Sequence, residues 1–252
     1  MNTHERIIWS ADVVGRDVLS GHIEEMLGLK QVKLDRLFLE REGRDVIAEV
    51  EDRGVWVFVD AKIVEISSKV VELAKLYLQY RPWMLNCMAG VVSTGLLHPS
   101  TREEEDQIDA LKRFADTCRA VGTRPCAVTV LTSKTPEVVS AEFNGRTPID
   151  QVLYYVERLL EAGFTDVVCS PQEDVAIRKE SRFSVLHLNN PGIQPEGVSQ
   201  YDQARTDTPT GAFKAGATRI IVGRALTRGN PAGNYMRLAA EVETAIARGY
   251  SA

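Results

Sequence analysis

Short β-rich runs alternate with helical patterns along the whole chain, and this alternation restricts the possible folds more than any other feature of the sequence. The runs are apolar and rich in β-branched residues, whereas several segments between them place apolar side chains at helical spacing. We predict strands within Arg6–Asp12, Gln31–Leu34, Val55–Ile63, Trp83–Met88, Pro125–Ser133, Asp166–Ser170, Phe183–Leu188 and Thr218–Gly223. A candidate helix follows each of them, as in Val18–Leu27, Phe38–Arg53 and Ser67–Tyr80.

Signals for helix ends support this division. Ser67 precedes a broad apolar stripe as a helix cap, and the acidic cluster Glu103–Asp106 is favourable at a helix N-terminus. Pro148 and Gly163 enclose another helical pattern, with proline at its start and glycine at its end. The strand–helix alternation therefore persists through the middle of the chain.

Eight such units within 252 residues are typical of a closed parallel barrel, because a helix must return the chain before each new parallel strand. A doubly wound open sheet is the alternative, but the GxGxxG turn expected after its first strand is missing. We therefore predict an α/β fold, a single (β/α)8 TIM-barrel domain over residues 1–252. In this architecture polar residues at the carboxyl ends of strands are candidate functional residues.

The composition argues against several classes of partner. The net charge is -5 and the basic residues are scattered, so we expect no nucleic acid partner. We expect no membrane span, because no apolar run approaches the ~20 residues that a helix needs to cross a bilayer. The four histidines are too dispersed to indicate a metal site. Four cysteines without CxxC spacing and a start without an apolar signal core indicate a cytoplasmic protein with reduced thiols.

Three charges interrupt the third predicted strand and the residues just after it. In the stretch VFVDAKIVEIS, Asp60 and Lys62 share one strand face, and Glu65 follows as the apolar run ends. The alternative is a structural ion pair, but a buried pair is weak evidence for stability. Asp12 and Lys33 approach the same barrel mouth from the first two strands, although alone they would suit a helix cap and a snorkelling lysine. Together, the charges of Asp12, Lys33, Asp60 and Lys62 indicate a catalytic site rather than a structural ion pair.

The last two strands indicate a phosphate site. A long polar loop containing Pro191 and Gln203 follows the seventh strand, and Gly223 and Arg224 end the eighth. Barrels commonly bind phosphate at these two loops, where backbone N–H groups and an arginine meet the dianion. A simple turn at Pro191 is the alternative. The position of these residues predicts a phosphorylated substrate.

These motifs resemble the orotidine 5'-monophosphate decarboxylase family. The similarity extends over nearly the whole chain. It is carried by SAD (Ser10–Asp12), VK (Val32–Lys33), DAKIVEI (Asp60–Ile66), TVLTS (Thr129–Ser133), VVCSPQE (Val167–Glu173), PGIQPEG (residues 191–197), DQARTDTP (residues 202–209) and IIVGRALT (Ile220–Thr227). The pattern DxKxx(D/E) alone marks a wider superfamily that includes sugar-phosphate decarboxylases and hexulose-phosphate synthases. The DQxRxxTP and VVCS segments are typical of the orotidylate branch.

The resemblance implies decarboxylation of orotidine 5'-monophosphate to UMP in de novo pyrimidine synthesis, without a cofactor. Lys33, Asp60 and Lys62 match the first three members of an alternating Lys–Asp–Lys–Asp array. It implies that Lys62 stabilises and then protonates the carbanion at C6 of the pyrimidine, while Asp60 lies beside the carboxylate that leaves. It also implies contacts of Asp12 with the ribose, of Thr132 or Ser133 with the pyrimidine, and of Gln203, Gly223 and Arg224, beside Pro191, with the phosphate.

Four positions depart from the family pattern. Glu65 replaces the aspartate that reaches into the active site of a partner subunit, so a homodimer with shared active sites is implied. Lys69 replaces a threonine supplied by the partner, Met88 a histidine, and Gln194 an arginine of the phosphate site. Two functions are therefore open: a divergent orotidylate decarboxylase, or a paralogue that binds a phosphorylated nucleotide or sugar without this decarboxylation. Retention of Lys33, Asp60 and Lys62 favours the first.

Overall fold

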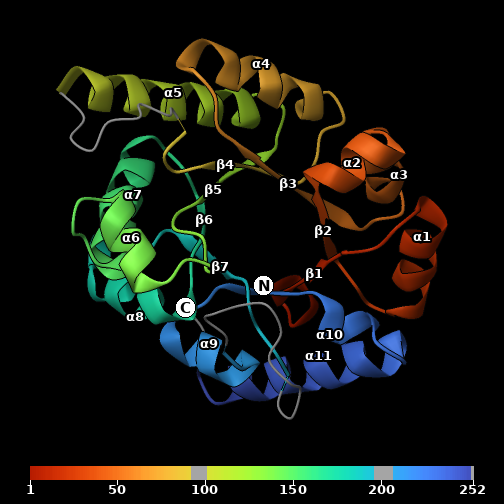
Figure 1. Ribbon diagram of the computed structural model, residues 1–252. Coiled ribbons are helices and arrows are strands. Elements are labelled where there is room, and N and C mark those ends of the chain that lie inside the picture. Colours follow the sequence, from red (N-terminus) through yellow and green to blue (C-terminus); the bar gives the residue numbers. More distant parts are fainter. Residues whose placement is uncertain (92–100, 196–206, 251–252) are drawn as a thin grey trace.

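The protein, described by a computed structural model over residues 1–91, 101–195 and 207–250, contains the predicted closed barrel. Eight parallel strands pair in chain order, and the last strand closes on the first (Figure 1). The strands are β1 (Ile7–Ser10), β2 (Gln31–Asp35), β3 (Trp56–Ile63), β4 (Met84–Met88), β5 (Arg124–Val128), β6 (Asp166–Val168), β7 (His187–Asn190) and β8 (Arg219–Val222). The prediction of a (β/α)8 barrel is confirmed.

Helices surround the ring of strands in Figure 1. They are α1 (Arg16–Glu25), α2 (Arg36–Glu42), α3 (Val46–Glu51), α4 (Ser67–Leu78), α5 (Thr101–Arg119), α6 (Pro136–Glu142), α7 (Pro148–Glu161), α8 (Pro171–Lys179), α9 (Pro209–Ala215), α10 (Arg224–Thr227) and α11 (Pro231–Ala247). Two short 3-10 helices, η1 (His4–Arg6) and η2 (Ser181–Phe183), precede β1 and β7. No helix in the described ranges is long and apolar enough to cross a bilayer.

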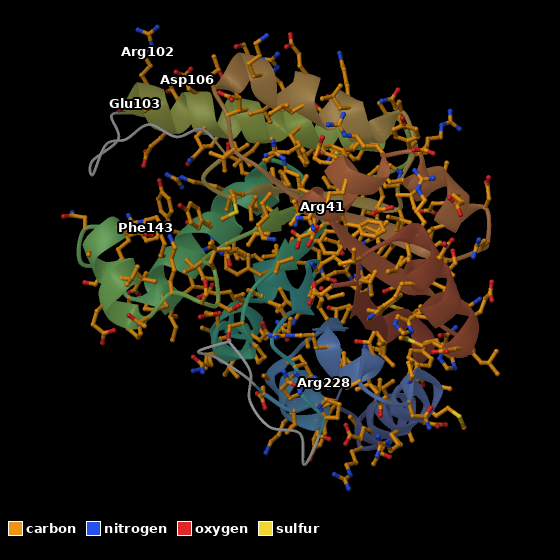
Figure 2. The ribbon with its side chains drawn as sticks, turned by 45° about the vertical axis from the view of Figure 1, so that its right-hand side comes forward. Arg41, Arg102, Glu103, Asp106, Phe143 and Arg228 are labelled. Atoms are coloured by element: carbon orange, nitrogen blue, oxygen red, sulfur yellow. The ribbon has the colours of Figure 1, made fainter. Side chains whose placement is uncertain are left out.

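Local chemistry explains several of these ends. The Thr147 side chain accepts a hydrogen bond from the backbone of Asp150, and Pro148 opens α7 as predicted. Ser170 and Glu173 form a reciprocal capping box at the start of α8. The acidic first turn of α5 includes Glu103, which Figure 2 shows with Arg102 and Asp106 at the outer end of that helix.

Several sequence predictions need correction, and the cap predicted at Ser67 is among them, because Ser67 is the first residue of α4 and makes no side-chain capping hydrogen bond. The helix predicted over Phe38–Arg53 is two helices, because Gly43 takes a positive φ of 92° and ends α2. The strand predicted over Pro125–Ser133 stops at Val128, and β7 runs from His187 to Asn190 rather than over Phe183–Leu188. Helices α6 and α10 were not predicted, because each is short and lacks a clear apolar period.

Apolar side chains form two layers on either side of the strands. The larger layer lies between the sheet and the surrounding helices, and includes Val57, Val59 and Ile63 from β3. The smaller layer fills the barrel interior and consists of Ile8, Phe58, Met84, Cys126, Val128, Val168 and Ile221. The alternation of β3 residues between the two layers is the one that the sequence predicted.

Candidate active site

A cavity of about 330 Å³ opens at the carboxyl ends of the strands. Its apolar floor includes Phe58, Val128, Val168 and Ile221 from the interior layer of the barrel. Its other lining residues include Asp12, Lys33, Asp60, Lys62, Thr132, Ser133, Pro191, Gly223 and Arg224, all of which the sequence analysis proposed as site residues. Strands from the whole circumference of the barrel therefore contribute to one cavity.

Asp60 lies at the centre of the charged side of this cavity. Its Oδ2 atom accepts hydrogen bonds from Lys33 Nζ and Lys62 Nζ, each at 2.7 Å. The Asp60 side chain is only 7% exposed, whereas that of Lys62 is 42% exposed at the mouth. The array thus has a buried carboxylate, one enclosed ammonium group and one ammonium group open to a ligand.

Burial and charge have opposite effects on the two buried groups of this array. Burial alone would raise the pKa of Asp60, but the charges and hydrogen bonds of Lys33 and Lys62 outweigh it and hold that pKa well below its usual range. Burial also opposes the charged form of Lys33, yet Asp60, Asp12 and Asp35 raise the pKa of this lysine. Asp60 is therefore a carboxylate and Lys33 an ammonium at neutral pH.

The backbone at Lys62 is left-handed, with a φ of 44°. This conformation is uncommon for a residue with a side chain and coincides with a shift in β3–β4 register between Val59 and Ile63. The released N–H of Lys62 donates to Asn86 Oδ1 at 2.7 Å. Asn86 Nδ2 in turn donates to Asp60 Oδ1 at 2.7 Å.

Asp12, Ser10 and Gly223 meet at the neighbouring edge of the cavity. Asp12 lies two residues beyond the end of β1, and its Oδ1 accepts a hydrogen bond from Ser10 Oγ at 3.4 Å. A Cβ atom on Gly223 would come within 3.2 Å of Asp12 Oδ2 and 3.7 Å of the Ser10 Cβ. Glycine at this position allows the loops after β8 and β1 to approach one another closely.

The remaining predicted contacts come from loops after β5, β7 and β8. Thr132 and Ser133 occupy the turn beyond β5, and Pro191 begins the loop beyond β7. Gln194 also lines the cavity, and its backbone N–H donates to the Asp207 carbonyl at 2.9 Å. Gln203 lies outside the described residues. Arg224 is exposed at the start of α10, on the rim of the cavity.

Glu65 lies away from the charged array of its own chain. Its side chain is exposed, and its Oε1 accepts a hydrogen bond from the backbone N–H of Ile66 at 2.9 Å. Lys69, another departure from the family pattern, pairs with Glu72 at 2.7 Å on the surface of α4. Met88 packs against the interior apolar layer. The structure therefore brings Lys33, Asp60 and Lys62 together but leaves Glu65 outside their cavity.

Asn86 was not predicted as a site residue, although it contacts two members of the array, Asp60 and Lys62. It lies in β4 between Met84, which belongs to the interior layer, and Met88, which packs against that layer. An asparagine on the inward face of a barrel strand, near its carboxyl end, was the available signal. Without the register of β3 against β4, nothing indicated that it would meet Asp60.

The fold and site define the class of this protein as a (β/α)8-barrel enzyme with a candidate active site at the carboxyl ends of its strands. Residues 28–237 match the family model described as the orotidine 5'-phosphate decarboxylase / HUMPS family. An orotidine 5'-phosphate decarboxylase of Staphylococcus aureus (strain Newman) is 33% identical over 213 residues, which cover 82% of this chain and 85% of the relative. The chain belongs to this family.

Solved structures show the same fold. The orotidine 5'-phosphate decarboxylase of Lactobacillus acidophilus superposes with a TM-score of 0.75 at 23% identity, over 94% of this chain and 98% of that one. An uncharacterized conserved protein of Geobacillus kaustophilus gives a TM-score of 0.70 at 25% identity, over 94% and 99% of the two chains. The family resemblance inferred from the motifs is confirmed.

Proposed function

We propose that this protein is a carboxy-lyase that converts orotidine 5'-monophosphate to UMP in pyrimidine synthesis. The observation that carries the proposal is the Asp60 carboxylate, held at 2.7 Å from both Lys33 Nζ and Lys62 Nζ at the mouth of the barrel. A protein that only binds a nucleotide has no need to bury this array. Membership of the decarboxylase family supports the same reaction.

The array suits a reaction in which negative charge moves from a carboxylate to a carbon atom. The bond between C6 and the carboxylate breaks, carbon dioxide leaves, and the electron pair stays at C6. Lys62 stabilises that carbanion and donates its Nζ proton to C6, which gives UMP. The lysine then regains a proton from solvent. No oxidant, reductant or metal is required by this balance.

Asp60 contributes by its fixed charge. Because its pKa is held low, it stays ionised beside the substrate carboxylate, and the repulsion between the two disappears as carbon dioxide forms. Its attraction for Lys62 also holds the proton donor in place. The apolar floor of Phe58, Val128 and Val168 offers carbon dioxide, an uncharged product, surroundings that suit it better than they suit a carboxylate.

The rest of the nucleotide would bind around the rim. We propose that Asp12 accepts hydrogen bonds from the ribose, that Thr132 and Ser133 contact the pyrimidine, and that Gly223, Arg224 and Gln203 bind the phosphate beside Pro191. Their position along the cavity supports this assignment for those that the structure describes. Gln194, in place of an arginine, leaves the phosphate site with one positive charge fewer.

The test is to follow the loss of orotidine 5'-monophosphate absorbance with purified protein, with and without a chelator. We expect turnover that the chelator does not change and that Lys62→Ala abolishes. Activity that needs a metal, or that survives Lys62→Ala, would contradict the mechanism. Tight nucleotide binding without turnover would instead support the paralogue that binds a phosphorylated ligand.

A second measurement addresses the phosphate. Arg224→Ala should weaken the binding of UMP much more than that of uridine, because an arginine–phosphate contact is charge-assisted. Isothermal titration with both ligands measures the two losses. Equal losses would mean that Arg224 does not contact the phosphate.

We also propose that two copies of the chain form a homodimer with shared active sites. Apolar side chains are exposed beside the mouth after three successive strands: Val14 (76% exposed), Leu37 (58%) and Ile66 (58%). Glu65 lies next to the last of these and outside its own cavity. A second copy covering this surface would bury the apolar side chains and carry each Glu65 toward the other cavity.

Complementation tests the shared site. Lys62→Ala and Glu65→Ala proteins should both be nearly inactive, and mixing them should restore activity because some heterodimers contain one intact site. Subunit exchange must be shown independently, for example by native mass spectrometry of differently tagged chains. A monomer by sedimentation, or exchange without recovery, would refute the shared site.

A further inference from the structure

Asn86 has an unusual position for a residue without a charge. It belongs to β4, is fully buried, and lines the cavity between the charged array and the apolar floor. Its two side-chain polar atoms are both used. Oδ1 accepts the backbone N–H of Lys62, and Nδ2 donates to Asp60 Oδ1, each at 2.7 Å.

These contacts allow one orientation of the amide. Turning it over would place Oδ1 against a carboxylate oxygen and Nδ2 against a backbone N–H, so two acceptors and two donors would face one another. The hydrogen bonds therefore define the position of the amide on both sides. A side chain that only filled space would need neither of them.

The Asp60 carboxylate is held differently at its two oxygens. Oδ2 accepts from both lysines, and Oδ1 accepts from Asn86. Without a donor at Oδ1, the carboxylate would be free to rotate about its Cβ–Cγ bond and offer either oxygen to Lys33 and Lys62. The amide supplies that donor without adding a third cation that would compete for Asp60.

The second contact stabilises the left-handed backbone of Lys62. Such a conformation costs about 1–3 kcal/mol for a residue with a side chain unless its surroundings favour it. The register shift between β3 and β4 releases the Lys62 N–H, and the Asn86 side chain replaces the strand carbonyl as its acceptor. The direction in which the Lys62 side chain leaves β3 depends on this bond.

We propose that Asn86 is a positioning residue of the active site, whose amide aligns the Asp60 carboxylate and the Lys62 ammonium group for proton transfer to the substrate carbon. The inference rests on the proposed decarboxylation and deepens it. Asn86 acts through Asp60 and Lys62, and the reacting carbon is contacted by Lys62. The consequence is a residue that sets kcat while contributing little to substrate binding.

The isosteric change Asn86→Asp provides a sharp test. While the introduced carboxyl group is neutral, it would keep one O–H donor for Asp60 and one carbonyl acceptor for Lys62. Once ionised, it would have no donor and would face Asp60 as a like charge. The titratable groups around this position are Asp60 and Lys62 on β3, Lys33 on β2 and Cys126 on β5. Asn86→Ala removes both contacts at every pH.

We expect both variants to lower kcat at pH 8 by roughly 100-fold, the cost of a small misplacement of reacting groups, with a much smaller change in KM. The kcat of Asn86→Asp, divided by that of the wild type at the same pH, should rise as the pH falls. The same ratio for Asn86→Ala should stay flat. A flat ratio for Asn86→Asp, or a higher KM with unchanged kcat in both variants, would overturn the inference.

Two controls separate this outcome from misfolding and from failure of the proposed function. Thermal unfolding and UMP binding report whether each variant is folded. If Asn86→Asp does not fold, Asn86→Ser replaces it as the second variant beside Asn86→Ala. Crystal structures of Asn86→Ala and the wild type give a readout that does not need activity. If the wild type decarboxylates nothing, the proposed function fails; unchanged Asp60 and Lys62 geometry in Asn86→Ala would then refute the positioning role separately.

Discussion

Each end of the barrel contains a buried aspartate paired with two cations, but the cations are lysines at one end and arginines at the other. At the mouth, Asp60 lies between Lys33 and Lys62. At the opposite end, where the strands begin, Asp166 lies between Arg124 and Arg219. Both aspartates are buried and each is paired with two cations. The proposal for the Asp60 array therefore depends on its position at the cavity mouth and on its lysines, and not on the buried aspartate alone.

Surroundings distinguish the two triads. Arg219 Nη1 donates to Asp166 Oδ1 at 2.9 Å and to Asn189 Oδ1 at 3.2 Å, and its guanidinium group lies 5.1 Å from the centre of the Trp83 ring. Trp83 stacks on Trp56, so aromatic rings lie beside the arginine. Arginine stays protonated in proteins and its planar fork suits a fixed carboxylate. The Asp166 triad is enclosed by these fixed partners, whereas Lys62 at the mouth is 42% exposed and is the proton donor of the proposed reaction.

The largest expected effect comes from replacing a lysine at the mouth of the barrel with arginine. Lys62→Arg keeps the positive charge but removes a group that can give up its proton, so kcat should fall by roughly 10²–10⁴-fold. The free energy of unfolding should change by less than about 1 kcal/mol, because the side chain is partly exposed. Steady-state kinetics and urea unfolding measure the two quantities. Retained kcat would show that Lys62 is not the proton donor.

Removing the carboxylate at the other end should give the opposite result. Asp166→Ala leaves Arg124 and Arg219 without their shared partner, and breaking a buried pair in this way costs about 3–5 kcal/mol. The kcat of the folded fraction should match that of the wild type. Urea unfolding followed by circular dichroism measures the loss. A stable variant with low activity would place Asp166 in the catalytic machinery instead.

A third buried aspartate sharpens the contrast. Asp174 on α8 contacts a thiol and an amide, Cys169 Sγ at 3.2 Å and Asn190 Nδ2 at 3.2 Å. Burial raises the pKa of Asp174 to about 7, although hydrogen bonds from Cys169 and Asn190 oppose this rise. Unlike Asp60, which is held charged by two lysines, Asp174 takes up a proton near neutrality.

The raised pKa of Asp174 determines the direction in which the stability of the protein changes with pH. Because the pKa of Asp174 is higher in the folded protein than in the unfolded chain, the wild type loses stability as pH rises from about 4 to 7, by up to about 4 kcal/mol. Asp174→Asn should therefore stabilise the protein more at pH 8 than at pH 5. Urea unfolding at both values tests this, with the exposed Asp109→Asn as control. An equal effect at the two pH values would mean that Asp174 is not protonated in this range.

The smallest effect is expected from replacing an arginine with lysine at the end of the barrel where the strands begin. Arg219→Lys keeps the charge beside Asp166 but loses the contact with Asn189 and the planar group over Trp83, so stability should fall by about 1–3 kcal/mol. The kcat should not change. A loss of activity comparable to that of Lys62→Arg would remove the functional distinction between the two triads.

The architecture and most of the site could be predicted from the chain alone. Strand and helix periods are local, so the sequence shows them directly. Because a repeated strand–helix unit leaves few closed arrangements, eight such units predicted the barrel. The period of β structure predicts that Asp60 and Lys62 share a strand face, and Lys33 faces the same side because its register partner on β3 is Phe58, two residues before Asp60. These are consequences of spacing along one or two segments.

Which charges meet, and how they are held, depends on the assembled barrel. Asn86 on β4 contacts both Asp60 and Lys62 where the register of β3 against β4 shifts, and Lys62 has its left-handed backbone in the same stretch. Asp166 gains its two arginines from β5 and β8, which lie far from it in the chain. Sequence periods describe which face a residue occupies, but the partner on that face is chosen by the register of other strands. That register is set by packing the whole barrel, which no single segment encodes.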